Sequence, residues 1–342
     1  MKAAVLKAPG VLELDSLPDP KCPRDGALVR VEACSVCGTD IKMLQRGHRD
    51  LVYPRIPGHE IVGTVLDIDQ ECRITEGDLV QVWPGIACGS CRPCQRGRDN
   101  ECERMKILGF SRDGGFAELI ALPKESVFRG LSPVKKHSDS GIIALAEPLA
   151  CCINGQELTR VSEGDTVLII GGGPIGCLHA ILAELRGAET IIVVEKLEGR
   201  IQRIKSHTGC AVWDASEPLE QAIAVETDGL GVDVILIATP EVKVDNFLLK
   251  LLAPGGRLCI FSGPRPEFSE ETIDLRSMHY RELTMVGAYG CSSRQNRMAV
   301  ELLASGRAKA DWIITKRTSL DRIQDALSHS SERRGLKPVI VR

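Results

Sequence analysis

In VLIIGGGPIGCLHA, residues 167–180, glycines interrupt an apolar stretch where a predicted strand meets a predicted helix. Such a turn lets the backbone approach a pyrophosphate, which then lies against the N–H groups at the helix N-terminus. The pattern therefore predicts a dinucleotide site. Its residues are the three spaced glycines and the two residues that open the helix: Gly171, Gly173, Pro174, Ile175 and Gly176.

An acidic residue, Glu195, ends the next predicted strand, close to the 20-residue interval at which a carboxylate binds the adenosine ribose. A carboxylate there hydrogen-bonds a free ribose diol and repels a 2′-phosphate, so the sequence favours NAD over NADP. Lys196 and Arg200 follow and would soften that repulsion, although charges at such positions are more often simply solvated. We include Arg200 among the predicted cofactor-binding residues.

Around this turn, apolar strands alternate with helical stretches, which is typical of a doubly wound parallel sheet. The first 150 residues carry short β-type runs instead, so the fold class is α/β with a β-rich domain before a Rossmann domain. We expect domain boundaries at 1–150 and 151–287, with 288–342 returning to the first domain. The predicted strands are 27–33, 60–68, 78–84, 166–171, 190–195, 232–238, 257–263 and 337–342.

Composition excludes several classes of protein. The chain has 342 residues, which favours two domains, and a formal net charge of -3, which gives no basic field for nucleic acid. It holds no apolar run long enough to span a membrane. The opening MKAAVLKAPGVLEL predicts strand, turn and strand rather than a signal peptide. We therefore expect a reducing cytoplasm, in which the fourteen cysteines serve as ligands or core residues rather than disulfides.

Four cysteines lie close together within residues 86–104, with the spacing C-x2-C-x2-C-x7-C: Cys88, Cys91, Cys94 and Cys102. Four thiolates fill the tetrahedral shell of zinc and leave no open position, so this lobe predicts a structural metal site. An iron–sulfur site is disfavoured, because the usual run has a shorter final spacing and a proline after the last cysteine. A nucleic-acid-binding zinc ribbon would suit the arginines of the lobe but lacks aromatic residues for stacking.

Candidates for catalysis lie earlier, in SVCGTD (35–40) and IPGHEIVG (56–63). Cys37 and His59 supply a thiolate and an imidazole, and catalytic zinc is typically held by three protein ligands with one position open. The HE pair is no metalloprotease motif, because Gly63 stands where HExxH requires its second histidine.

Taken together, these motifs resemble the zinc-containing medium-chain alcohol dehydrogenases along essentially the whole chain. The motifs that carry the resemblance, in order, are Cys37-Gly-Thr39-Asp40, Gly58-His59-Glu60-x-x-Gly63, the cysteine lobe, Glu147-Pro148-Leu149 and the glycine turn. The EPL motif is similar to the polyol (sorbitol-like) and threonine dehydrogenase branch. The resemblance implies a GroES-like catalytic domain with a structural zinc lobe, followed by a Rossmann domain.

For the site, the resemblance implies that Cys37 and His59 bind a catalytic zinc. Glu60 would be the third ligand or an exchangeable neighbour, and Glu147 would hold the fourth position directly or through water. Asp40 would orient the ligands from behind. Thr39 would begin a proton relay, whose continuation stays open because Lys42 stands where many relatives have histidine.

These implications add up to a zinc-dependent oxidoreductase that transfers a hydride from a secondary alcohol to NAD, with two zinc ions per chain. The expected substrate is a small polyol or sugar alcohol, although residues 286–295 lack an obvious match to the arginine that sorbitol dehydrogenases use. The alternatives are an L-threonine 3-dehydrogenase-like enzyme and, less favoured, a nucleotide-binding zinc scaffold without catalysis. We expect a homodimer or homotetramer from the resemblance, and neither a nucleic-acid nor a membrane partner.

Overall fold

The computed structural model describes residues 1–69 and 73–342 and divides the chain into two compact units. Unit 1 contains Met1–Ala150 and Cys291–Arg342, and unit 2 contains Cys151–Gly290. The boundary between them falls within helix α5 (Ala146–Leu158). Unit 1 is therefore built from both ends of the sequence, with unit 2 inserted.

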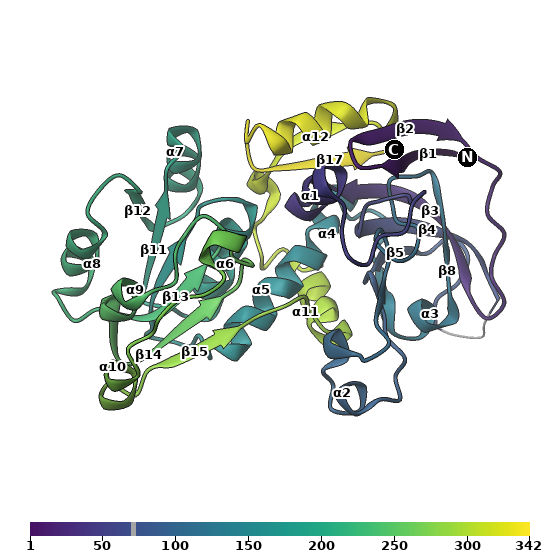
Figure 1. Cartoon of the computed structure of the whole chain (residues 1–342). Coiled ribbons are helices and arrows are strands. Elements are labelled where there is room, and N and C mark those ends of the chain that lie inside the picture. Colours follow the sequence, from purple (N-terminus) through teal and green to yellow (C-terminus); the bar gives the residue numbers. More distant parts are fainter. Residues whose placement is uncertain (70–72) are drawn as a thin grey trace. The chain divides into compact units, whose positions relative to one another are not determined.

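Unit 2 is built on a six-stranded parallel sheet with helices between the strands (Figure 1). Its strands are β10 (Thr166–Ile170), β11 (Thr190–Glu195), β12 (Ala211–Asp214), β13 (Val232–Ile237), β14 (Leu252–Ile260) and β15 (Thr284–Gly287). Its helices are α6 (Pro174–Leu185), α7 (Glu198–His207), α8 (Leu219–Thr227), α9 (Asn246–Leu251) and α10 (Leu275–Tyr280).

The strand order, β12-β11-β10-β13-β14-β15, confirms the predicted doubly wound sheet. It is the order of dinucleotide-binding folds, in which the chain starts at the centre and winds outward in both directions. The direction of winding reverses between β10 and β13. Ligands of such sheets bind outside the carboxyl ends of the strands at this point, where the glycine turn follows β10.

The predicted strand at 257–263 is wrong in its bounds, because β14 runs from Leu252 to Ile260. The strand begins before Pro254 and the glycines at 255 and 256, although Gly255 has a φ of +76°. The pairing of β14 with β13 skips between Val232 and Val234, which accommodates the extra residues as a bulge. The other predicted strands match observed ones to within two residues at each end.

Unit 1 is mainly antiparallel. Among the described residues its largest sheet has seven strands, ordered β16-β17-β3-β4-β5-β9, with β8 also paired to β3. The strands are β1 (Lys2–Ala8), β2 (Val11–Ser16), β3 (Ala27–Ser35), β4 (Glu60–Ile68), β5 (Leu79–Val82), β6 (Gly85–Ile86), β7 (Lys106–Ile107), β8 (Leu119–Leu122), β9 (Leu131–Val134), β16 (Ile314–Thr318) and β17 (Lys337–Val341). The helices are α1 (Gly38–Arg46), α2 (Arg92–Gln95), α3 (Lys124–Gly130), α4 (Ser140–Ala144), α11 (Ser293–Ala304) and α12 (Ile323–Ser331).

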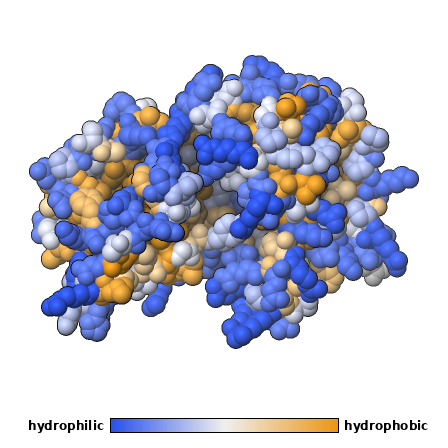
Figure 2. All heavy atoms as spheres, viewed as in Figure 1, coloured by the Kyte–Doolittle hydropathy of each residue, from blue (hydrophilic) through white to orange (hydrophobic). Residues whose placement is uncertain are grey.

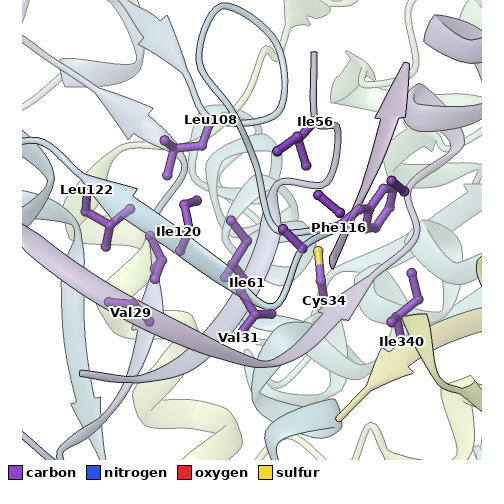
Figure 3. Close-up of a cluster of buried hydrophobic side chains, with 14 of the residues drawn as sticks. Val29, Val31, Cys34, Ile56, Ile61, Leu108, Phe116, Ile120, Leu122 and Ile340 are labelled. Atoms are coloured by element: carbon purple, nitrogen blue, oxygen red, sulfur yellow. The ribbon is translucent and has the colours of Figure 1, made fainter. Parts of the chain in front are cut away.

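The core of unit 1 lies against β3 and β4, and alternate residues along most of β3 are buried in it (Figure 3). Val29 and Val31 from β3 meet Ile61 from β4, while Phe116 and Ile340 come from segments far apart in the sequence. Strand β17, near the end of the chain, thus packs with strands formed by its first third. This arrangement joins the two sequence segments of unit 1 into one core.

Hydrophilic residues cover much of the face seen in Figure 2, with hydrophobic residues scattered among them. Within the described part of the chain, every helix is too short or too polar to cross a bilayer.

Among the buried polar residues of unit 2 is a histidine. His179, on α6, is fully buried, and its ring packs edge-on against Phe261 with the centroids 4.6 Å apart. The Nε2 atom finds no hydrogen-bond partner among the residues that the structure describes. Burial and, to a smaller extent, the charge of Arg186 lower the pKa of His179 to about 3. The imidazole is therefore neutral in the folded protein.

This neutral histidine predicts a loss of stability in mild acid. The unfolded chain binds a proton at His179 near pH 6.5 and the folded chain only near pH 3, so the contribution is complete above about pH 6.5 and falls as pH drops below it. The slope is at most about 1.4 kcal/mol per pH unit. In urea unfolding between pH 7.5 and 5, His179→Leu should lose less stability than the wild type. Substitution of the exposed His207 by Leu is the control, and parallel losses in wild type and His179→Leu would contradict the prediction.

Candidate active site and cofactor site

Cys37 is held at the N-terminus of α1 by a reciprocal cap. Its sulfur accepts a hydrogen bond from the Thr39 N–H at 3.4 Å, and the Asp40 carboxylate accepts one from the Cys37 N–H at 2.8 Å. The sulfur thus takes the place of the hydroxyl that usually caps a helix.

His59 lies immediately before β4 and is 5% exposed. The preceding Gly58 has a φ of +93°, and a side chain there would meet the Phe116 ring at 2.7 Å. Glycine is therefore required for the turn that points His59 inward. The His59 Nδ1 atom is 3.3 Å from Asp40 Oδ1, an ion-pair distance, although neither atom makes a well-directed hydrogen bond within residues 1–69 and 73–342.

The electrostatics of His59 are set by its two neighbours. Burial alone would lower the pKa of His59, but the Asp40 carboxylate and the Cys37 sulfur outweigh it and raise that pKa well above its ordinary value. With Asp40 beside Nδ1, the other ring nitrogen is the one available to a ligand. A carboxylate behind a ligating histidine is the arrangement that fixes ring orientation in zinc sites.

The structure brings Cys37, His59 and Glu60 together, with one potential ligand atom of each within 4.8 Å of the others. A thiolate, an imidazole and a carboxylate are all ligands that zinc accepts, and the Asp40 carboxylate lies behind the imidazole, as carboxylates do behind zinc-binding histidines. The residues therefore fit a zinc ion.

Glu60 is already engaged from both sides. Its Oε1 atom accepts a hydrogen bond from Lys337 Nζ at 2.6 Å, and its Oε2 atom accepts one from Ser35 Oγ. The sheet register explains this, because Ser35 on β3 pairs with both Glu60 on β4 and Val339 on β17. Sequence reasoning missed Lys337, since only the pairing of the last strand reveals it.

Lys337 connects Glu60 to the other charged groups of this site. Burial would lower the pKa of Lys337, but Glu60, Cys37 and Glu147 raise it above the ordinary value, so the ammonium group is retained. Glu147 lies in the first turn of α5, and its carboxylate is within 4.8 Å of the Cys291 sulfur. Cys291 is a second residue that sequence reasoning missed.

The remaining predicted residues of unit 1 lie around this cluster. Thr39 is half-buried on the first turn of α1, while Lys42 is exposed on the same helix. The ring of Phe110 makes edge contacts with both His59 and His48, with centroid distances of 5.2 and 5.1 Å. Phe110 thus lies between the two histidines, a relation that their sequence separation does not reveal.

The four lobe cysteines also converge, with all four sulfurs within 4.8 Å of one another. Cys91 Sγ is 3.4 Å from Cys94 Sγ and 3.9 Å from Cys102 Sγ. Two sulfurs of a zinc tetrahedron lie about 3.8 Å apart, given Zn–S bonds of about 2.3 Å. The lobe therefore fits one zinc ion with a filled shell.

Backbone groups in the lobe favour thiolates. Hydrogen bonds from the N–H groups of Ser90 and Cys91 lower the pKa of Cys88 to about 5. Burial and the neighbouring Cys91 sulfur raise the pKa of Cys94 to about 12. A cation among the four sulfurs would reverse the second effect, because it stabilises every thiolate.

In unit 2, the glycine turn has the close packing that the motif requires. A Cβ atom on Gly176 would lie 1.8 Å from the Gly171 carbonyl oxygen, so this position excludes any side chain. Gly173 is the N-cap of α6, and Pro174 and Ile175 begin the helix. The turn thus presents open backbone N–H groups at a helix N-terminus, which fits a pyrophosphate.

Glu195 and Arg200 both lie beside this turn. Glu195 Oε1 accepts hydrogen bonds from the backbone N–H groups of Lys196 and Leu197 at 2.7 and 3.0 Å. Arg200 Nη1 is 3.6 Å from Glu195 Oε2 and 3.4 Å from the point where a Gly173 side chain would begin. Arg200 therefore pairs with the acid next to the glycine turn.

A cavity of about 290 Å³ opens at the carboxyl ends of β10, β11 and β12. Its lining includes Ile170, Val194 and the segment 213–215. Lys243 and Phe247, which come later in the sequence, also line it. Sequence reasoning missed these residues, although Asp214 ends a strand as Glu195 does. Apolar walls with a few polar groups are typical of small-ligand pockets.

Comparison with known proteins identifies the family. Residues 23–132 match the alcohol dehydrogenase GroES-like domain, and residues 174–305 match the zinc-binding dehydrogenase domain. A D-altritol 5-dehydrogenase from Agrobacterium fabrum is 31% identical over 81% of this chain and 80% of its own length. An L-threonine 3-dehydrogenase from Pyrococcus horikoshii is 31% identical over 95% and 94%.

A solved structure of a zinc-binding dehydrogenase from Sinorhizobium meliloti, bound to NADP, matches with a TM-score of 0.90. It is 31% identical and covers 100% of this chain and 99% of its own. The chain belongs to the zinc-type medium-chain alcohol dehydrogenases. The predicted family, fold class and polyol/threonine branch are thereby confirmed. The protein is an NAD(P)-dependent zinc alcohol dehydrogenase that acts on secondary alcohols.

The two clusters predict two zinc ions of different lability. The purified protein should hold two per chain, and a chelator should remove the ion of the open Cys37 site faster than that of the closed lobe. Cys91→Ser should lose one zinc and lower the melting temperature by about 10 °C, because a lobe of this kind folds around its metal.

Elemental analysis and thermal unfolding measure both effects. Cys22→Ser is the matched control, because Cys22 is a half-buried cysteine of unit 1 outside both clusters. A single zinc that survives chelation together with full activity would remove the Cys37 site from consideration.

Proposed function

We propose that this dehydrogenase oxidises a secondary hydroxyl of a polyol or sugar alcohol with NAD. In this proposal unit 1 is the catalytic domain, including the returning segment, and unit 2 binds the cofactor. The observation that carries it is the cluster of half-buried Cys37 with buried His59 and Glu60, which lies beside Lys337 at one end of β3 and β4.

We assign the roles in unit 1 from the observed contacts. Cys37 and His59 hold the catalytic zinc, with Asp40 fixing the imidazole through Nδ1. Glu60 acts as an exchangeable neighbour, because Lys337 and Ser35 already occupy both of its oxygens. Glu147 completes the site directly or through water, and its effect on Lys337 supports a place near the same charges.

A zinc ion held by Cys37 and His59 would polarise the substrate hydroxyl, and a bound nicotinamide would supply the acceptor for the carbinol hydride. The chain must then remove one proton. We assign its first acceptor to the Thr39 hydroxyl, which lies two residues after Cys37 on the same helix. Lys42 is exposed and so can exchange protons with solvent.

The substrate class rests on the carboxylates of the site and on the relatives. Glu147 stands in the EPL motif, and the relatives include enzymes named for D-altritol and for L-threonine. An aromatic content of 4% gives little material for a pocket that stacks bulky aromatic alcohols. A vicinal diol with a secondary carbinol suits the site best.

A substrate panel monitored by NADH formation tests the proposal. We expect turnover of sugar alcohols or other vicinal diols above that of ethanol or benzyl alcohol. Cys37→Ser should lower kcat on the order of a thousandfold while NAD binding persists, because metal polarisation contributes several kcal/mol to the barrier. Cys22→Ser should remain active. Best activity on ethanol, with none on diols, would overturn the substrate class.

The second candidate substrate is a β-hydroxy amino acid. It is favoured by the threonine dehydrogenase that aligns with 95% of this chain. Higher kcat/KM on L-threonine than on every polyol in the same panel would select this candidate and reject the polyol.

Glu195 supports NAD as the preferred cofactor. Its Oε1 atom is held by two backbone N–H groups, which leaves the carboxylate fixed at the strand end next to the glycine turn. Arg200 pairs with the other oxygen of Glu195, and this pairing weakens its attraction for a 2′-phosphate. The similar structure from Sinorhizobium meliloti is bound to NADP, so the preference of this chain for NAD over NADP is tested by kinetics.

Glu195→Ser should weaken NAD and improve NADP. The change removes charge-assisted ribose hydrogen bonds and the repulsion of a phosphate, whereas the serine hydroxyl can still accept the local N–H groups. The ratio of kcat/KM for NAD to that for NADP should fall about tenfold to a hundredfold. Glu198→Ser, at an exposed position in the first turn of α7, is the control. A wild type that prefers NADP would contradict the assignment.

We propose a homodimer or homotetramer and a reducing compartment such as the cytoplasm. Strand β15 supports self-association, because it lies at the edge of the unit 2 sheet with unpaired backbone groups on one side. The proposed metal sites require reduced thiolates, which a reducing compartment preserves. Sedimentation analysis would test the oligomer.

A further inference from the structure

The cysteine lobe makes a buried contact with a distant part of unit 1. Asp99 lies in the turn between Cys94 and Cys102 and is 4% exposed. Its carboxylate accepts a hydrogen bond from the Ser293 N–H at 2.9 Å and one from Ser293 Oγ at 2.6 Å. Ser293 is the first residue of helix α11 and is itself 5% exposed. The contact spans 194 positions in the sequence.

This contact completes the cap of α11. Ser292 satisfies the Gln295 N–H, and the Gln295 side chain in turn accepts from the Ser292 N–H. Asp99 supplies a partner for the Ser293 N–H, which this local capping box leaves open, and places a negative charge where the helix dipole favours it. The anion that caps α11 is thus provided by the lobe.

The segment so anchored includes Cys291, where the chain re-enters unit 1. The carbonyl of Cys291 accepts a hydrogen bond from Trp83 Nε1 at 3.1 Å, and its sulfur lies within 4.8 Å of the Glu147 carboxylate. Only Ser292 therefore separates Ser293, which Asp99 anchors, from Cys291, whose side chain lies near Glu147.

We propose that Asp99 is a positioning residue through which the metal-bound lobe holds Cys291 against Glu147. The proposal builds on the proposed function, since Glu147 belongs to the site assigned there. Folding of a four-cysteine lobe depends on its metal. The position of Asp99, and with it the start of α11, then depends on the lobe zinc as well. The lobe then stabilises the active site as well as its own fold.

Alkylation of Cys291 reports on this link directly. The full-length, zinc-loaded protein is treated with iodoacetamide under native conditions, and the rate at each cysteine is read by peptide mass spectrometry. Asp99→Ala should raise the Cys291 rate on the order of tenfold, because two hydrogen bonds to a charged group are lost. Cys34, a fully buried cysteine of β3, should keep its slow rate. Asp99→Asn should fall between wild type and Asp99→Ala, because its amide can replace part of the contact.

The dependence on the lobe metal is tested by a double-mutant cycle. Cys91→Ser should raise the Cys291 rate as Asp99→Ala does, and the two changes together should add little, because they break the same link. Asp274→Ala is the matched control: it also removes an aspartate that caps a helix, in unit 2, and should leave the Cys291 rate unchanged.

Three results would overturn the proposal: an unchanged Cys291 rate in Asp99→Ala, an equal rise at Cys34, or fully additive effects of Asp99→Ala and Cys91→Ser. In steady-state kinetics, Asp99→Ala should raise KM for the alcohol more than KM for NAD, which a general loss of stability would not do. A protein without dehydrogenase activity would refute the proposed function, yet its alkylation rates would still decide the role of Asp99.

Discussion

The buried ion pair between Lys337 and Glu60 is the interaction on which the rest of the site depends. Removing a carboxylate from water is costly unless a cation is buried with it, and the loss of one partner leaves the other uncompensated. Lys337 offsets Glu60 directly and Cys37 and Glu147 at longer range. The acidic groups can therefore gather within a hydrophobic unit before any metal neutralises them.

The two cysteine-containing clusters differ in how much of them the sequence predicts. The lobe is local: its four ligands lie within 15 residues, so spacing alone predicts the site. The Cys37 cluster is assembled by sheet register, in which Ser35 pairs with Glu60 and with Val339. The motifs around Cys37 and His59 indicate a metal, whereas Lys337 and Cys291 become visible only when the last segments of the chain return to unit 1.

The same distinction holds for the fold. Apolar periodicity places β10, β11 and β13 well. It misses the start of β14, where the register shifts around proline and two glycines, and it predicts neither β12 nor β15. The glycine turn is predictable because steric exclusion at Gly176 allows no other residue. The identities of the pocket residues around Asp214 depend on strand order, which a single sequence indicates only as a class.

The discontinuity of unit 1 affects the order in which the protein can form during synthesis. Strand β17 follows β3 by about 300 residues, yet it lies between β16 and β3, so the Ala33–Ser35 edge of β3 lacks this neighbour until residues 337–341 have been made. Unit 2 is contiguous and can fold while the ribosome still holds the C-terminal segment. Until Lys337 emerges, Glu60 has no buried cation, and the nascent unit 1 exposes an open sheet edge that a chaperone or another chain can bind.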